Sequence, residues 1–162
     1  SQNSLQILEL ADSQGINIRE YACTLLAIAV TPTEGVFFQI GDGVIVIGAE
    51  GNYYPVFWPM NGEYANSTYF ITEEHSVKQA QFKIVNNQTI ENVALMSDGL
   101  QGLALHFATK TAHSPFFQPM FSRLAEESNS GLSEILSTSL EEVVNSEQVC
   151  SRTDDDKSLI LA

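Results

Sequence analysis

Residues 152–161 have the sequence Arg152-Thr153-Asp154-Asp155-Asp156-Lys157-Ser158-Leu159-Ile160-Leu161, in which an acidic run is followed at once by apolar residues. The apolar residues predict a short strand over residues 158–162. A run of Asp is ordinarily a solvated loop. A carboxylate at the end of a strand is also held firmly enough to bind a divalent cation, so this segment is a candidate for both roles.

Two amphipathic helices are predicted immediately before this segment. Their apolar residues recur three and four positions apart, which places them on one face of a helix. The first face contains Phe116, Phe117, Met120, Phe121, Leu124 and Ala125, and the second contains Leu132, Ile135, Leu136, Leu140, Val143 and Val144. The Ser- and Glu-rich residues 126–130 are predicted to form the loop between them.

Earlier residues are predicted to be mostly antiparallel strands. Residues 22–30 are almost continuously apolar, which predicts a central strand buried on both faces. Residues 36–40 and 44–47 are predicted to form a hairpin closed by Gly41-Asp42-Gly43. Residues 53–58, 68–71, 81–85 and 92–96 predict further strands, and residues 4–14 predict a helix that ends at Gly15. Strands followed by helices and a returning strand predict an α+β sandwich.

The composition limits the classes of function. At 162 residues and 44% hydrophobic content, we expect residues 1–162 to form a single domain. The net charge of −13, from 20 acidic and 7 basic residues, argues against nucleic acid and membrane surfaces as partners. Two cysteines without zinc or disulfide spacing, and no segment resembling a secretion signal or a membrane span, predict a cytoplasmic protein.

Three acidic positions lie beside predicted strands: Asp42 in Gly41-Asp42-Gly43, Asp98 after the strand at 92–96, and the run 154–156 before the last strand. Taken singly, each is explained by turn or loop chemistry, because Asp before Gly is common in turns. The run at 154–156 lacks the spacing, glycine and glutamate of an EF-hand loop. Carboxylates that converge on one point would repel one another unless a divalent cation lay between them.

The histidines are predicted to have ordinary surface or packing roles. On a helix, His106 and His113 would lie roughly 10 Å apart at a rise of ~1.5 Å per residue, too far to share one ion. The sequence contains no Gly-x-Ser-x-Gly elbow, phosphate-binding P-loop or dinucleotide motif, which argues against serine hydrolases, kinases and dehydrogenases.

The order of the acidic motifs resembles a known family. Gly-Asp-Gly at residues 41–43, Leu-Met-Ser-Asp-Gly-Leu at residues 95–100 and the segment at 152–161 occur in the order found in the PP2C-type, or PPM, protein phosphatases. The likeness runs through most of the chain, includes residues 62–68, and is greatest to the bacterial branch. The segment at 152–161 is its most specific motif.

This resemblance implies an αββα sandwich that hydrolyses phosphoserine and phosphothreonine in proteins. It implies that Asp98 binds the first ion of a binuclear Mg²⁺ or Mn²⁺ centre and that Asp155 is a second ligand. Asp42 matches a position near an optional third ion. Asp154 and Asp156 remain alternatives to Asp155, although as loop residues they are the weaker candidates. In this family a metal-activated water attacks phosphorus without a phosphoenzyme.

The sequence also departs from the family pattern. The N-terminal motifs, which include an acidic metal pair and an Asp-Gly whose aspartate bridges both ions, are not found in residues 1–162, so we expect an N-terminally incomplete phosphatase domain. Gly102 replaces an aspartate that many members have four residues after the first metal ligand. Two alternatives follow: a phosphatase-fold module that binds or regulates a partner without turnover, and a plain cation-binding domain.

Overall fold

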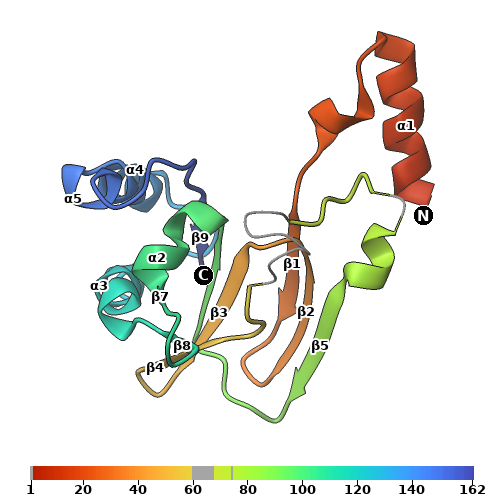
Figure 1. Ribbon diagram of the computed structural model, residues 1–162. Helices are drawn as coiled ribbons and strands as arrows, with labels where there is room; N and C mark the ends of the chain where they lie inside the picture. The colour runs from red at the N-terminus through yellow and green to blue at the C-terminus, as the bar shows by residue number, and fades with distance from the viewer. Residues whose placement is uncertain (1, 60–67, 74) are drawn as a thin grey trace. The chain divides into compact units, whose positions relative to one another are not determined.

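The computed structural model describes residues 2–59, 68–73 and 75–162, with side chains described from residue 6 onward. The chain divides into two compact units (Figure 1). Unit 1 contains Ser1–Gly43 and Pro59–Gln88, and unit 2 contains Val44–Trp58 and Thr89–Ala162. The single domain expected for residues 1–162 stays a prediction.

Unit 1 begins with the helix α1, Gln2–Gln14, which confirms the predicted helix. Gly15 follows with a φ of +64°, a left-handed conformation that glycine adopts without a steric penalty. The amide of Ile16 donates to the carbonyl of Ala11 at 3.0 Å, which closes the last turn. A 3-10 turn, η1 (Ile18–Tyr21), connects α1 to the sheet.

The sheet of unit 1 consists of β1 (Leu25–Val30), β2 (Glu34–Ile40) and β5 (Gln81–Asn86), all antiparallel, with a 3-10 turn, η2 (Ser76–Gln79), before β5. The strand order β1-β2-β5 makes β1 an edge strand, so the prediction of a central strand at residues 22–30 is wrong. Leu25 is 40% exposed and Val30 is 37% exposed. A short apolar run predicts a strand, but it does not predict whether that strand is central or at the edge of its sheet.

The two faces of this sheet differ. Phe37, Gln39 and Val85 share one face and are buried. Val36, Phe82 and Ile84 share the other face and are exposed.

The segment Gly41–Gly43 follows β2 and does not form the predicted hairpin. β2 pairs with β1 and β5, whereas the next strand, β3 (Val44–Ala49), pairs with strands of unit 2. The side-chain amide of Gln39 donates to the carbonyls of Gly41 and Gly43 at 3.1 and 2.8 Å, which holds the connection in place. Gly41 has a φ of +100°, and a Cβ there would lie 2.3 Å from Cγ2 of Thr24. The glycine therefore serves close packing as well as the turn.

The sheet of unit 2 has the strand order β4-β3-β6-β9 and is also antiparallel. Its remaining strands are β4 (Asn52–Pro55), β6 (Asn92–Met96) and β9 (Leu159–Leu161). Val44 and Val46 on one face of β3 and Ile45 and Ile47 on the other are all buried. The strands predicted at residues 81–85, 92–96 and 158–162 are confirmed, as is the strand at 53–58 in its first half.

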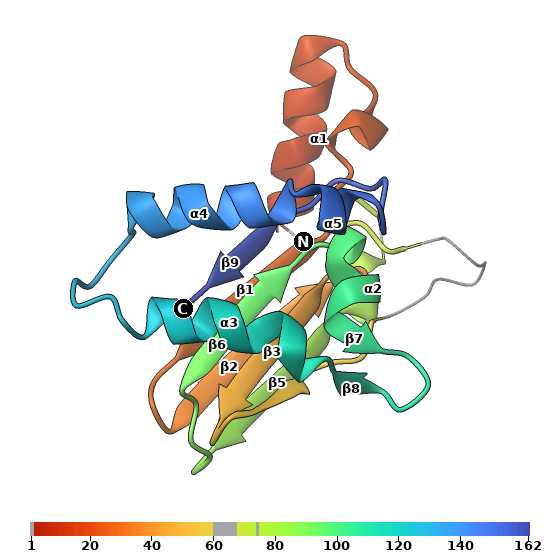
Figure 2. The same ribbon diagram turned by 90° about the vertical axis from the view of Figure 1, so that its left-hand side faces the viewer.

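Helices cover one face of this sheet, as Figures 1 and 2 show for α3 and α4. After β6 come η3 (Asp98–Leu100), α2 (Gln101–Ala104), the two-strand hairpin β7 (Leu105–His106) and β8 (Thr111–Ala112), and α3 (Ser114–Leu124). The helices α4 (Glu134–Val144) and α5 (Glu147–Cys150) follow. Both predicted amphipathic helices are confirmed.

The core of unit 2 is centred on aromatic rings. Tyr53 of β4 stacks on Phe117 and Phe121 of α3 with ring centroids 5.3 and 5.6 Å apart. Burial, together with the charge of Glu91, raises the pKa of the Tyr53 phenol. The cluster continues through Val44, Val46, Ala94, Met96, Leu100, Ala104, Leu105, Ala112 and Val149.

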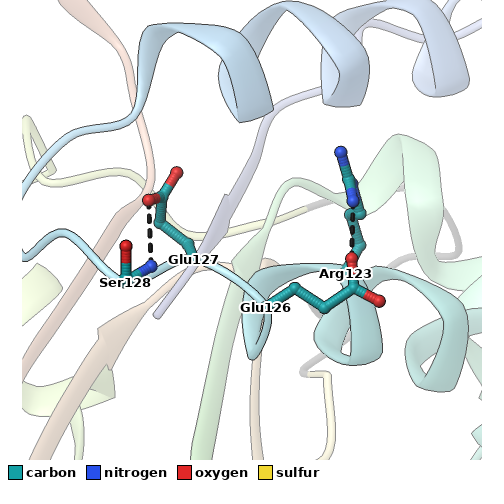
Figure 3. Close-up of polar contacts among 4 residues, drawn as sticks. All are labelled: Arg123, Glu126, Glu127 and Ser128. Carbon is teal, nitrogen blue, oxygen red and sulfur yellow. Dashed lines mark hydrogen bonds and ion pairs between the residues drawn. The ribbon is translucent and has the colours of Figure 1, made fainter.

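The loop after α3 is held by local polar contacts (Figure 3). Arg123 pairs with Glu126, and the carboxylate of Glu127 accepts from the amide of Ser128 at 3.0 Å and from the hydroxyl of Ser133 at 3.2 Å. The hydrogen bond from the backbone amide of Asn129 lowers the pKa of Glu127, and those from Ser133 and Ser128 add to this, because they stabilise its ionised form.

Two other predictions concern residues 60–71. Residues 68–71 do not form the predicted strand, although the amide of Ile71 donates to the carbonyl of Cys23 at 3.0 Å. Residues 62–67 of the family-like segment lie outside the described residues. Among the helices that the structure describes, none is both long and apolar enough to cross a membrane.

Candidate metal centre

Asp98 lies at the end of β6, where it is the first residue of η3. Its carboxylate is exposed, and its Oδ1 accepts a hydrogen bond from the amide of Gly99 at 3.0 Å. A carboxylate that accepts from the next amide is restricted in orientation. The strand end therefore presents a partly oriented, solvent-accessible carboxylate.

Asp155 lies in the loop between α5 and β9 and has a similar local arrangement. Its Oδ1 accepts from the amide of Asp156 at 2.9 Å, and its own amide donates to Oγ1 of Thr153 at 3.3 Å. The ammonium group of Lys157 donates to the Asp155 carbonyl at 3.3 Å, so this lysine supports the loop backbone. Asp155 is exposed, like Asp154 and Asp156.

The pairing of β6 with β9 brings these two segments together. Met96 is paired with Leu159 in antiparallel register, so the residues after β6 adjoin the residues before β9. The amide of Ser97 donates to the carbonyl of Ser158 at 3.1 Å. The Ser97 hydroxyl accepts from the amide of Ser158 at 2.9 Å and donates to the carbonyl of Asp156 at 3.2 Å. Ser97 thus ties the Asp98 segment to the loop that contains Asp155.

Gly99 shows how closely the two segments approach. A Cβ on Gly99 would lie 2.4 Å from the carbonyl oxygen of Asp156 and 3.3 Å from Cβ of Asp155. The first distance is shorter than side-chain carbons tolerate, so the close approach requires glycine at this position. The Gly of the Ser-Asp-Gly motif therefore has a packing role that its sequence context, a turn, does not reveal.

Asp42 and Gly102 are the other residues singled out from the sequence. Asp42 belongs to unit 1, whereas Asp98 and Asp155 belong to unit 2. Gly102 is exposed in α2, and a Cβ there would meet nothing within 4 Å. An aspartate could therefore fit at position 102 without steric crowding.

The donor set suits a hard divalent cation but is small. Exposed carboxylates next to backbone carbonyls are the oxygen ligands that Mg²⁺ and Mn²⁺ prefer. No group of three or more His, Cys, Asp or Glu side chains with metal-site geometry occurs within residues 2–59, 68–73 and 75–162. The described residues thus bring two acidic segments together without forming a complete ligand set.

The placement of His106 and His113 corrects the sequence analysis. They are not on a helix: His106 is in β7, and His113 follows β8 and precedes α3. Nε2 of His106 and Nδ1 of His113 are 2.7 Å apart and share a hydrogen bond. Thr109 and Thr111 lie between the two histidines, and β-branched residues favour strands. These threonines could have predicted a hairpin here and not a helix.

Comparisons with known proteins agree with the motif order. The family model described as Protein phosphatase 2C matches residues 1–144, a range that includes Asp42 and Asp98 and stops before Asp155. Serine/threonine-protein phosphatase 3 of Escherichia coli (strain K12) is 37% identical over 152 residues, which cover 94% of this chain and 59% of that protein. This chain therefore spans less than two thirds of the length of that relative.

Solved structures give the same fold. A crystal structure of a bacterial serine phosphatase matches with a TM-score of 0.60 at 15% identity, covering 98% of this chain and 64% of the other. A structure of a bacterial serine phosphatase with an arginine-to-lysine mutation matches with a TM-score of 0.62 at 14% identity, with coverage of 98% and 64%. The family match over residues 1–144 shows that this chain belongs to the protein phosphatase 2C family, and the structures confirm the α+β fold.

Proposed function

We propose that this chain forms part of a metal-dependent phosphatase that hydrolyses phosphoserine and phosphothreonine in proteins. The observation that carries the proposal is the junction of β6 and β9, where Ser97 joins the Asp98 segment to the Asp155 loop. Family membership adds the substrate class, since the curated relative is named as a serine/threonine-protein phosphatase. We retain the cytoplasm as the expected location, with no nucleic acid or membrane partner.

Asp98 and Asp155 would hold the cation at this junction. Each has one carboxylate oxygen oriented by the following amide, at 3.0 and 2.9 Å, so little side-chain freedom would be lost on binding. Asp155 is favoured over Asp154 and Asp156 because its Cβ lies beside Gly99, the residue that follows Asp98. Asp42 is proposed only for an optional third ion, because that is the position it matches in the family pattern.

When bound, Mg²⁺ or Mn²⁺ supplies Lewis-acid chemistry and a water of lowered pKa. The contribution of this chain is to bind and orient. Asp98 and Asp155 present oxygen ligands, the two following amides fix their orientation, and the Ser97 hydroxyl keeps the two loops in register. Because a 1 Å displacement of a ligand lowers activity strongly, this support matters for the chemistry.

The activity should require residues beyond the pair described. Residues 1–162 lack the acidic pair and bridging aspartate that the family uses, so they provide at most half of a binuclear centre. We therefore expect residues 1–162 alone to be inactive, and a parent protein that contains those motifs to be active with Mn²⁺ or Mg²⁺. Clear hydrolysis of p-nitrophenyl phosphate by residues 1–162 alone would contradict the half-site argument.

The ligand assignment is tested by Mn²⁺ titration of residues 1–162 and three variants. Asp98→Asn and Asp155→Asn should each weaken Mn²⁺ affinity at least about tenfold, because each removes a charged oxygen ligand. Asp154→Asn is the matched control, since it makes the same chemical change one residue away and should leave the affinity within about twofold. Equal losses in Asp154→Asn and Asp155→Asn would show general charge attraction in place of ligation.

A module that binds or regulates a partner without turnover is the second candidate. It is favoured by the absence of a three-ligand group among the described residues and by Gly102 in place of the family aspartate. The two functions can be separated in a protein that contains this chain together with the acidic pair and the Asp-Gly motif. If such a protein loses turnover in Asp98→Asn, the module hypothesis is wrong. A plain cation-binding domain would bind Mn²⁺ equally well with Asp98→Asn.

A further inference from the structure

The hairpin of β7 and β8 contains a histidine pair that the proposed phosphatase chemistry does not use. His106 is opposite Thr111, and the amide of His113 donates to the carbonyl of Ala104 at 2.7 Å. His113 is therefore two residues beyond the partner of His106 on the adjacent strand, which places both side chains on the same face. The ring centroids are 4.5 Å apart and the rings are nearly perpendicular.

The side chain of His113 is directed at His106 and not at the helix that follows it. His113 precedes α3, yet its side chain makes no capping hydrogen bond to the helix. Its Nδ1 is instead 2.7 Å from Nε2 of His106. Since one proton lies between these two nitrogens, one ring donates and the other accepts. Each ring keeps its second nitrogen for solvent or other partners.

We propose that His106 and His113 form a two-histidine site for a transition-metal ion, with Cu²⁺ or Ni²⁺ favoured and Zn²⁺ weaker. The ligands would be Nε2 of His106 and Nδ1 of His113, with water completing the coordination. At metal–nitrogen bonds of ~2.0 Å, two nitrogens lie about 2.8 Å apart at a 90° angle and about 3.3 Å apart at a tetrahedral angle. The observed hydrogen-bond separation of 2.7 Å shows that the two nitrogens approach as closely as one ion requires. The preference for Cu²⁺ and Ni²⁺ over Zn²⁺ follows from the usual affinity order for the first-row metals and from the square-planar angle.

The proton balance of binding is simple. In the hydrogen bond, one facing nitrogen carries a proton, and a metal ion needs both facing lone pairs. The donor ring therefore changes tautomer: the N–H bond on its facing nitrogen breaks, and one N–H bond forms on its other nitrogen. The protons are then on Nδ1 of His106 and Nε2 of His113, and no net proton leaves the pair. The rings also rotate so that both lone pairs point at one ion.

The surrounding sequence distinguishes this site from the carboxylate pair at the β6–β9 junction. Residues 105–114 contain no Asp or Glu, and Lys110 contributes a positive charge. Hard cations such as Mg²⁺ need oxygen ligands, which the hairpin does not supply from carboxylates. Imidazole nitrogens suit Cu²⁺, Ni²⁺ and Zn²⁺, with Cu²⁺ the tightest in the usual order. The proposal does not depend on the phosphatase activity.

The test is a titration of residues 1–162 with Cu²⁺, Ni²⁺, Zn²⁺ and Mg²⁺ as chloride salts. We expect one equivalent of Cu²⁺ and of Ni²⁺ to bind, with Zn²⁺ weaker and Mg²⁺ without effect at this site. His106→Gln should lower Cu²⁺ and Ni²⁺ affinity at least about tenfold, because a single imidazole cannot chelate. His113→Gln should do the same, and circular dichroism checks that both variants fold.

The third histidine of the chain provides a matched control. His75 is exposed and lies in unit 1, so His75→Gln makes the same chemical change outside the hairpin. It should leave Cu²⁺ and Ni²⁺ affinity within about twofold. Asp98→Asn should also leave it unchanged. Equal affinities in wild type and His106→Gln, or an equal loss in His75→Gln, would overturn the proposal.

Nuclear magnetic resonance of the ring nitrogens gives a second measurement. With Zn²⁺, which is diamagnetic, the signals of Nε2 of His106 and Nδ1 of His113 should shift together, and both rings should take the tautomers stated above. The ring signals of His75 should not move. A shift of His75 with the same dependence on Zn²⁺ would indicate binding without a defined site.

Discussion

The two sheets of this protein are built from similar apolar strands but are covered differently. In unit 2, β3 is buried on both faces, and aromatic residues of α3 stack on Tyr53. In unit 1, Phe82 and Ile84 are 61% and 55% exposed, although Phe37 on the opposite face is completely buried. Because stability comes from apolar area removed from water, the unit 2 sheet should contribute more of it per residue.

The comparison also explains where the candidate centre is. Asp98 and Asp155 adjoin the sheet whose core is covered by helices, at the junction of β6 and β9. Carboxylates must be held firmly to bind a metal ion, and strand ends of a packed sheet provide that support. The segment around Asp42 lies in the other unit, where Gln39 and Gly41 supply the local order.

The largest expected effect is on stability, and it is measured by truncating one phenylalanine in each unit. Phe117→Ala should lower the free energy of unfolding by about 3–5 kcal/mol, because a fully buried ring leaves a cavity. Phe82→Ala should lower it by less than about 1 kcal/mol, because most of that ring is already in water. Urea unfolding followed by circular dichroism measures both, and Trp58 fluorescence reports on unit 2. Equal losses would contradict the assigned difference.

A smaller change in stability is expected within unit 2, where two glycines three residues apart differ in how closely other atoms approach them. Gly99→Ala should lower the free energy of unfolding by about 1–3 kcal/mol, because its Cβ would overlap the carbonyl of Asp156. Gly102→Ala should raise it by roughly 0.5–1 kcal/mol, because the position is open and helical. Thermal unfolding separates the two. Stabilisation by both substitutions would mean that the Asp155 loop does not approach Gly99 closely.

The smallest effect concerns the loop after α3. The pKa of Glu127 is lowered by its hydrogen bonds to Asn129, Ser133 and Ser128, so its ionised form stabilises the folded state. This contribution to stability is fully present above pH 4.5, the ordinary pKa of a glutamate. It is lost as the pH falls through the lower pKa that Glu127 has in the folded protein. The difference in urea midpoint between wild type and Glu127→Gln should therefore be seen at about pH 6 and shrink at acidic pH.

Glu126→Gln is the control for that measurement. Glu126 forms an ion pair with the exposed Arg123, and exposed ion pairs contribute little to stability. Its urea midpoint should stay near that of the wild type at both pH values. A pH-dependent difference as large in Glu126→Gln as in Glu127→Gln would show that net charge, and not the hydrogen bonds of Glu127, causes the effect.

Elements with a clear period were predictable from the sequence. The helices α3 and α4 follow from apolar residues three and four apart, and β6 and β9 follow from short apolar runs with polar ends. The candidate aspartates followed from a motif order shared with a family. Single aspartates in turns would not have been enough, because the same residues are common in loops without a ligand.

Long-range relations were not predictable from the pattern. The apolar run at residues 22–30 does not encode that β1 is an edge strand, and Gly41-Asp42-Gly43 has the composition of a hairpin turn although β2 and β3 pair with different strands. The contact between His106 and His113 was missed because their spacing was measured along a helix, whereas the chain forms a hairpin there.

The family, the periodic helices and the residue types that could hold a cation were predictable from the amino-acid sequence. They follow from local spacing and motif order, which are present before the chain folds. The folded structure was needed to show that Ser97 and Gly99 join Asp98 to the Asp155 loop, and that two histidines face each other at 2.7 Å. Such contacts depend on which strands pair, and strand pairing is set by the packing of residues far apart in the chain.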